Sequence, residues 1–148
     1  PIGGKVAKLK FWDTAGQERY SMLNSIYFRN SHFILFVFDA QSDESFENVN
    51  FWLLQTQKAI EKTNYYLIAN KMDLISEIQQ LQKLKQKAEQ YAQEMQMKYF
   101  EISAKTGQGV DKLVQDIVNE YANDALKDDK VKQIKTQLKV DEQPKFCC

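Results

Sequence analysis

The residues best suited to chemistry stand together in the stretch DTAGQE, which follows an alternating apolar and polar segment near the start of the chain. Asp13 offers a carboxylate, Gly16 a backbone N–H without an obstructing side chain, and Gln17 an amide that both donates and accepts hydrogen bonds. At the end of a strand, such a set could serve one phosphate as a metal-linked carboxylate, a backbone donor and a water-orienting amide. This interpretation depends on whether other strands end in comparable loops.

Two further loops of this kind follow apolar segments. NKMD follows NYYLIAN, and SAK comes at the end of MKYFEIS. In an open α/β sheet, ligands bind at the carboxyl ends of the strands, so these loops stand where a site is expected. Each loop alone would also fit an exposed turn. Because three of them occur in this order, each after a predicted strand, the sequence favours one shared site.

The elements that would position these loops alternate between strands and helices. Strands are expected at residues 6–12, 32–39, 64–70 and 97–103, and helices at residues 42–62, 76–95 and 109–123. The second strand is a continuous apolar run, which predicts a central position in a parallel sheet. This alternation predicts an α/β layered fold with a mostly parallel sheet.

The predicted helices carry start signals of differing kinds. Ser42 is the expected N-cap of the first helix, and Ser76 with Gln79 has the spacing of a capping box at the second. The inner face of the second helix would begin at Ile78. Its apolar spacing would also fit a short coiled-coil seam, but the heptads do not continue beyond Met95, which favours a helix lying on a sheet.

Composition limits the classes of protein that fit. The 148 residues are 43% hydrophobic and 12% aromatic, enough for one domain with a sizeable core. Twenty basic and 20 acidic side chains leave no net charge, which indicates no nucleic-acid partner. The longest apolar run, residues 33–38, is too short to span a bilayer, so we expect a cytoplasmic protein. The apolar period fades after Asn123, which predicts a domain at residues 1–123 and a flexible tail at residues 124–148.

The three loops resemble the switch and guanine-binding motifs of the Ras superfamily of small GTPases. Within that superfamily the chain is similar to Rab proteins, in KLKFWDTAGQE, RYSMLN, YFRNS, FVFDAQ and the closing Cys147-Cys148. The resemblance runs from about Val6 to Tyr121 and resumes at the last two residues. It implies a three-layer P-loop NTPase-type fold, GTP or GDP and Mg²⁺ as ligands, and slow GTP hydrolysis as a switch in vesicle-mediated transport.

The resemblance also implies roles around the phosphates. Asp13 would hold Mg²⁺ through a water, Gly16 would donate its N–H to the γ-phosphate, and Gln17 would orient the attacking water. Catalysis of this kind rests on positioning and on neutralising charge. Asp39 is expected to order a loop rather than to touch the ligand.

The residues that the resemblance assigns to the base are Asn70, Lys71, Asp73, Ser103, Ala104 and Lys105. A carboxylate such as Asp73 can accept parallel hydrogen bonds from N1 and N2 of guanine, which adenine cannot supply, so the site would discriminate against ATP. Asn70 would join the two loops and reach N7, Lys71 would lay its stem along the base, and the Ala104 N–H would meet O6. Ser103 and Lys105 would shape their loop.

The family's phosphate-binding motif, G-x-x-x-x-G-K-[ST], is absent from this sequence. Gly3-Gly4-Lys5 matches only its end, and Val6 replaces the required Ser or Thr, so we interpret this stretch as a hairpin turn. The motif and the following switch segment should lie before Pro1. The expected fold is therefore N-terminally truncated, with the first central strand and helix missing. We expect residues 1–148 alone to bind GTP poorly and their sheet to be rearranged.

Cys147 and Cys148 are the only cysteines and the last two residues. They are either two incidental thiols or, by resemblance to Rab proteins, a double prenylation site, since two lipid chains anchor a protein stably where one does not. The resemblance implies a peripheral location on the cytosolic face of intracellular membranes. It also implies effectors, exchange factors and GTPase-activating proteins as partners. The alternative is a non-hydrolysing interaction module that binds partners without nucleotide control.

Overall fold

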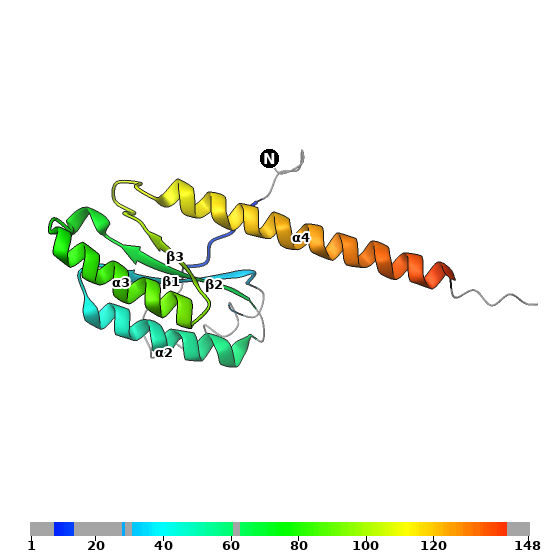
Figure 1. The fold of residues 1–148 in the computed structure, drawn as a ribbon, viewed down its shortest axis with the longest axis horizontal. Coiled ribbons are helices and arrows are strands. Elements are labelled where there is room, and N and C mark those ends of the chain that lie inside the picture. Colours follow the sequence, from blue (N-terminus) through cyan, green and yellow to red (C-terminus); the bar gives the residue numbers. More distant parts are fainter. Residues whose placement is uncertain (1–7, 14–27, 29–30, 61–62, 142–148) are drawn as a thin grey trace, which may run out of the picture. The chain divides into compact units, whose positions relative to one another are not determined.

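The computed structural model describes residues 8–13, 28, 31–60 and 63–141, with side chains as far as Ala125. In chain order the elements are β1 (Phe33–Asp39), α2 (Asp43–Ala59), β2 (Asn64–Asn70), the 3₁₀ turn η2 (Met72–Leu74), α3 (Ile78–Glu94), β3 (Lys98–Glu101) and α4 (Val110–Asp141) (Figure 1). The chain divides into two compact units, described separately here. Residues 9–114 hold the sheet with α2 and α3, and residues 115–141 form most of α4.

The three strands form one parallel sheet in the order β1-β2-β3. Asp39 at the end of β1 lies opposite Asn70 at the end of β2, and Ala69 lies opposite Glu101 at the end of β3. Parallel neighbours need a crossover, which α2 and α3 supply. All three carboxyl ends therefore meet at the same edge, and the predicted α/β fold with a parallel sheet is confirmed.

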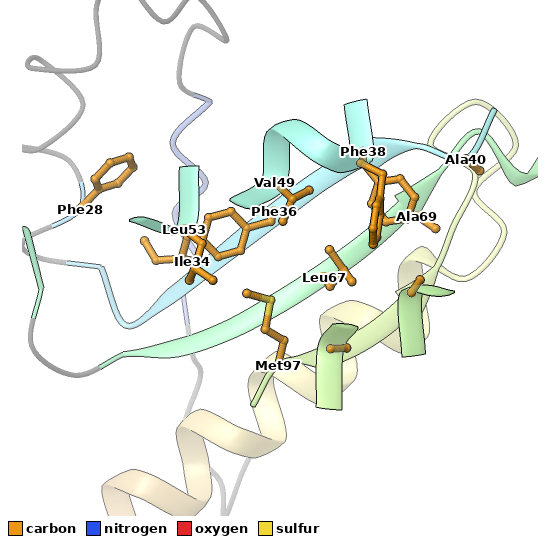
Figure 2. Close-up of a cluster of buried hydrophobic side chains, with 13 residues drawn as sticks. Phe28, Ile34, Phe36, Phe38, Ala40, Val49, Leu53, Leu67, Ala69 and Met97 are labelled. Carbon is orange, nitrogen blue, oxygen red and sulfur yellow. The ribbon is translucent and has the colours of Figure 1, made fainter. Parts of the chain in front are cut away.

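The core lies between one face of the sheet and the helices α2 and α3 (Figure 2). Because side chains alternate along a strand, Phe36 and Phe38 of β1 point to this face together with Leu67 of β2. Leu53 of α2, which is 1% exposed, packs into the same cluster. This packing fixes the register of the strands whose ends carry the site.

β2, rather than β1, is the fully buried strand. Tyr66, Leu67, Ile68 and Ala69 have no exposed surface, whereas Val37 of β1 is 56% exposed. The prediction that the apolar run at residues 33–38 is a central strand is therefore wrong within the described sheet, where β1 stands at the end of the strand order. A continuous apolar run indicates burial on both faces, but in β1 only alternate residues, such as Phe36 and Phe38, are buried.

The predicted strand at residues 6–12 is also wrong for the part that the structure describes. Residues 8–13 have no regular secondary structure, and the side chains of Phe11 and Trp12 are 66% and 65% exposed. Alternation predicts a strand only if a neighbouring strand pairs with its backbone groups and a core receives its apolar face. These residues pair with no strand of the described sheet.

The two crossover helices begin differently. The Ser42 side chain accepts a hydrogen bond from the Ser45 N–H at 3.1 Å, so the predicted N-cap of α2 is confirmed. In α3 the N-cap is Glu77, and its side chain makes no capping bond, so the predicted capping box at Ser76 is wrong. Ile78 is 73% exposed, because the first turn of α3 does not yet lie on the sheet. Further along α3, Ala88 is buried and Leu84, Tyr91 and Met95 pack against the core, which confirms this part of the apolar face predicted from the sequence.

α4 continues to Asp141, so the predicted helix end at Asn123 is wrong. The fading of apolar residues after Asn123 therefore does not mark the end of the helix. Residues 110–141 contain neither Pro nor Gly, the strongest helix breakers, and six of them are Lys, which favours helices. In the part of the chain that the structure describes, we find no helix with the length and apolar character to cross a membrane.

Candidate functional site

The loops that follow the three strands are joined at the carboxyl edge of the sheet. The Ala40 N–H donates to the Asn70 carbonyl at 2.9 Å, which ties the loop after β1 to the end of β2. The Met72 N–H donates to the Ile102 carbonyl at 3.1 Å, which ties the loop after β2 to the loop after β3. The backbone therefore holds the predicted site segments side by side.

Side chains of the NKMD and SAK loops interlock across this edge. The Ala104 N–H donates to Asn70 Oδ1 at 3.0 Å, and Ser103 Oγ donates to Asp73 Oδ1 at 2.6 Å. Lys105 Nζ lies 3.9 Å from Asp73 Oδ2. The structure thus brings together five of the residues that the sequence predicts for the base site. As predicted, Asn70 joins the two loops.

These contacts orient the polar groups. The Asp73 side chain is 15% exposed, and its short bond from Ser103 fixes the plane of the carboxylate. Asn70 accepts through its oxygen, so its NH₂ group is the part that can donate to a ligand. The Ala104 N–H, predicted to meet guanine O6, donates to Asn70, so a base would have to share or replace that bond.

A left-handed residue turns the NKMD loop back towards SAK. Lys71 has φ 65° and ψ 33°, and η2 follows it directly. The Leu74 N–H donates to the Lys71 carbonyl at 3.0 Å and closes the turn that carries Asp73. A residue with a side chain rarely adopts positive φ unless its surroundings impose it. No feature of the sequence marks Lys71 for this conformation.

The loop after β3 depends on two glycines that the sequence analysis did not single out. Ser103 is fully buried, its N–H donates to the Gln108 carbonyl at 2.9 Å, and its carbonyl accepts from the Gly107 N–H at 2.8 Å. Gly107 and Gly109 have φ of 83° and 76°. A Cβ on Gly109 would collide with the Glu101 carbonyl oxygen at the end of β3. The paired glycines in TGQG are the signal that could have identified them.

Asp39 orders the loop after β1, as predicted. Its Oδ2 accepts from Lys71 Nζ at 2.7 Å, and its Oδ1 accepts from the Gln41 N–H at 2.9 Å. The Lys71 hydrogen bond, followed by the Gln41 bond, lowers the pKa of Asp39 below its ordinary 3.8. Gln41 also donates through Nε2 to the Leu74 carbonyl at 2.9 Å, a contact that the sequence analysis missed.

The phosphate side of the predicted site is described only in part. Asp13 is exposed, and Gly16 and Gln17 lie outside the described residues, as do Cys147 and Cys148. Within the described ranges there is no group of three or more His, Cys, Asp or Glu side chains suited to a metal ion. The Mg²⁺ assignment therefore rests on Asp13 alone and, like the roles of Gly16 and Gln17, stays a prediction.

A parallel sheet with helical crossovers, whose carboxyl edge joins an Asn-Lys-x-Asp loop to a Ser-Ala-Lys loop, defines an α/β domain of the P-loop GTPase type. A model of the Ras family matches residues 1–123. The chain belongs to the Ras family, and its predicted likeness to Rab proteins is confirmed by its relatives.

Three of these relatives illustrate the likeness. Ras-related protein Rab-21 of Mus musculus is 34% identical over 132 residues, which cover 88% of this chain and 58% of that protein. GTP-binding protein YPT52 of Saccharomyces cerevisiae is 36% identical over 143 residues, covering 84% and 61%. Ras-related protein Rab-1A of Dictyostelium discoideum is 35% identical over 125 residues, covering 82% and 59%. The chain thus spans about 58–61% of the length of these curated relatives.

Proposed function

We propose that the carboxyl edge of the sheet binds the guanine base of GTP and GDP. The observation that carries this proposal is the interlocked set of Asn70, Asp73, Ser103 and Ala104, in which Ser103 orients a mostly buried carboxylate. Guanine presents N1–H and the N2 amino group side by side, and such a carboxylate accepts both in parallel. Adenine has no matching pair of donors, so the same geometry rejects it.

The neighbouring groups complete the recognition of the base. The Asn70 NH₂ group would donate to N7, since its oxygen already accepts from Ala104. The aliphatic stem of Lys71 would cover one face of the base, since a lysine side chain combines an apolar stem with a charged end. The polar contacts of Asp73 and Asn70 would then select guanine over other bases, and the apolar contact of Lys71 would add affinity.

We assign GTP hydrolysis to the loop that contains Asp13, Gly16 and Gln17. Membership of the Ras family supports this assignment. Asp13 would hold Mg²⁺ through a water, which supplies positive charge beside the phosphates, while Gly16 donates its N–H to the γ-phosphate and Gln17 orients the water. The sequence contains no G-x-x-x-x-G-K-[ST] motif, so these 148 residues by themselves should bind GTP weakly.

The cellular role follows from the same family. We propose a Rab-like switch in vesicle-mediated transport, recognised by effectors, exchange factors and GTPase-activating proteins. It would be held on the cytosolic face of intracellular membranes by prenylation of Cys147 and Cys148. The Rab relatives and the cysteine pair support this proposal. Mass spectrometry of the C-terminal peptide from membrane fractions tests the anchor, and a wholly unmodified peptide contradicts it.

The base assignment is tested by titrating the chain with GDP, IDP and ADP. IDP lacks only the 2-amino group, so the structure predicts that GDP binds at least about tenfold more tightly than IDP, with ADP weaker still. Asp73→Asn replaces one carboxylate oxygen with an NH₂ group and should abolish the preference for GDP over IDP. It should also favour XDP, whose base has an acceptor where guanine has its amino group.

Asp43→Asn is the matched control. Asp43 is the first residue of α2, and its carboxylate pairs with Lys87 at 2.8 Å rather than with a residue predicted for the base, so its substitution should leave the order of the nucleotides unchanged. Equal binding of all the nucleotides would overturn the base assignment. Failure of every nucleotide to bind, even at concentrations that would detect the weak binding expected without the phosphate-binding motif, would favour the alternative, an interaction module without nucleotide control.

A further inference from the structure

The end of β1 and the loop after it contact the turn that carries Asp73. Asp39 lies opposite Asn70 in the parallel register, and the left-handed backbone of Lys71 directs its side chain back to β1. Lys71 Nζ then lies 2.7 Å from Asp39 Oδ2. The ion pair thus connects the loop after β1 with the first residue of the turn.

A second contact holds the far end of the same turn. Gln41 donates its N–H to Asp39 Oδ1 and its side-chain amide to the Leu74 carbonyl, both at 2.9 Å. Lys71 and Leu74 flank Asp73, so the loop after β1 contacts the turn on both sides of the predicted base reader. Neither contact involves Asp73 itself.

The backbone of Asp39 is hydrogen-bonded to the start of α2. Its N–H donates to Ser45 Oγ at 2.9 Å, and Ser45 Oγ in turn lies 2.9 Å from the Ser42 carbonyl, to which it donates. The Ser42 side chain caps the helix by accepting from the Ser45 N–H. The Asp39 carboxylate therefore stands on a backbone fixed by the helix cap, and its side chain is 25% exposed.

We propose that Asp39 is a positioning residue for the guanine site, which fixes Lys71 directly and, with Gln41, the turn that presents Asp73. The proposal rests on the proposed function and adds to it a residue of β1 that does not touch the base. An unrestrained lysine side chain would lose rotamer freedom when it covers a base, and this loss opposes binding. Because the ion pair with Asp39 already restrains Lys71 in the protein without ligand, less of this freedom is lost on binding, which is preorganisation.

The binding experiment compares Asp39→Asn with the wild-type chain, using fluorescent GDP as the probe. The amide retains the shape of Asp39 and an acceptor for Gln41, but it removes the charge that holds Lys71. We expect GDP to dissociate roughly threefold to tenfold faster, as for the loss of one partly exposed charge-assisted hydrogen bond. In a cycle with Lys71→Met, the double variant should be no worse than the more affected single variant.

The ion pair between Lys87 and Asp43 supplies the matched control. It has nearly the same length, 2.8 Å, but it joins the first residue of α2 to α3 and does not involve Lys71 or the turn that carries Asp73. Asp43→Asn should therefore leave GDP dissociation unchanged, and Asp39→Glu should restore part of the loss because it restores the charge. The proposal is overturned if Asp39→Asn behaves like Asp43→Asn, if it tightens binding, or if its effect adds fully to that of Lys71→Met.

A measurement without nucleotide separates this proposal from the proposed function. Amide hydrogen exchange of the chain should become faster at residues 71–75 in Asp39→Asn, since the Leu74 N–H bond to Lys71 closes the turn, and should not change in β2. If the wild-type chain binds no guanine nucleotide, the proposed function fails. The hydrogen-exchange measurement still tests whether Asp39 holds the turn at residues 71–75. Unchanged exchange at residues 71–75 would overturn the positioning role.

Discussion

The two carboxylates of the site are distinguished by the partners of their oxygens. Both oxygens of Asp39 accept close hydrogen bonds, from Lys71 and Gln41, so the group is committed to holding the protein together. In Asp73, Ser103 engages Oδ1 at 2.6 Å, whereas Lys105 lies 3.9 Å from Oδ2, too far for a hydrogen bond. Asp73 Oδ2 therefore has no donor within hydrogen-bond distance among the described contacts and is open to the N–H donors of a base, whereas each oxygen of Asp39 already accepts from the protein.

The lowered pKa of Asp39 predicts a pH dependence. A carboxyl whose pKa is lower in the folded than in the unfolded state stabilises the fold above the unfolded value, ordinarily 3.8. The stabilisation by the Asp39–Lys71 pair should therefore be complete near neutral pH and disappear as the pH falls below about 4. Urea unfolding of the wild-type chain and Asp39→Asn across this range measures the difference. A difference that persists undiminished at the acid end would contradict the prediction.

The helices α2 and α3 act on the site indirectly, by burying one face of the sheet and so fixing where its strands end. The contact of α2 with β1 is built on side chains such as Leu53, which is 1% exposed, and on the edge-to-face pair of Phe46 with Phe38 at 5.0 Å. The adjacent Leu54, about 100° further round the helix, is 49% exposed. One helix thus offers a buried leucine and an exposed one for comparison.

Leu53→Ala should destabilise the sheet unit by about 2–5 kcal/mol, since it removes buried methyl groups and leaves a cavity. Leu54→Ala should change the free energy of unfolding by less than about 0.5 kcal/mol, as expected of a surface position. Chemical unfolding of both variants measures the two values. Equal losses would show that α2 does not pack on β1 by the face described here.

The loop after β3 gives a second matched pair. Gly109→Ala would place a Cβ against the Glu101 carbonyl at positive φ, and should cost about 2–4 kcal/mol of stability. Around Gly107 no atom lies within 4 Å of a Cβ, so Gly107→Ala should cost only the left-handed backbone penalty of about 1–2 kcal/mol. Thermal unfolding ranks the two variants, and the reverse order would exclude the described loop geometry.

Considered as a whole, the molecule consists of two compact units. The sheet with its two crossover helices lies within residues 9–114, and most of α4 belongs to the other unit. The residues predicted for the base lie within residues 9–114, while the terminal cysteines come after α4 in the sequence. Along the sequence, α4 therefore stands between the predicted base-binding residues and the predicted anchor.

This division predicts that α4 can be broken without unfolding the sheet. Ala125 is exposed in the helix interior, where proline costs about 3 kcal/mol or more by removing a hydrogen bond and clashing with the preceding turn. Ala125→Pro should lower the far-UV helical signal and leave the urea midpoint of the sheet unit unchanged. Leu54→Pro, inside α2, is the contrasting variant and should lower that midpoint strongly. A fall in midpoint with Ala125→Pro would show that the units unfold together.

The sequence by itself determined the elements whose signals are local. The apolar runs of β1 and β2, the Ser42 cap and the loops after β2 and β3 are all legible over a few residues, and the family follows from those loops. Only the tertiary structure decided that β1 ends the strand order, that residues 8–12 form no strand of the described sheet and that Asp39 meets Lys71, 32 positions away. The apolar periodicity of a segment indicates how much of it is buried. It does not show which strand or helix the segment contacts, because pairing depends on contacts between segments far apart in the chain.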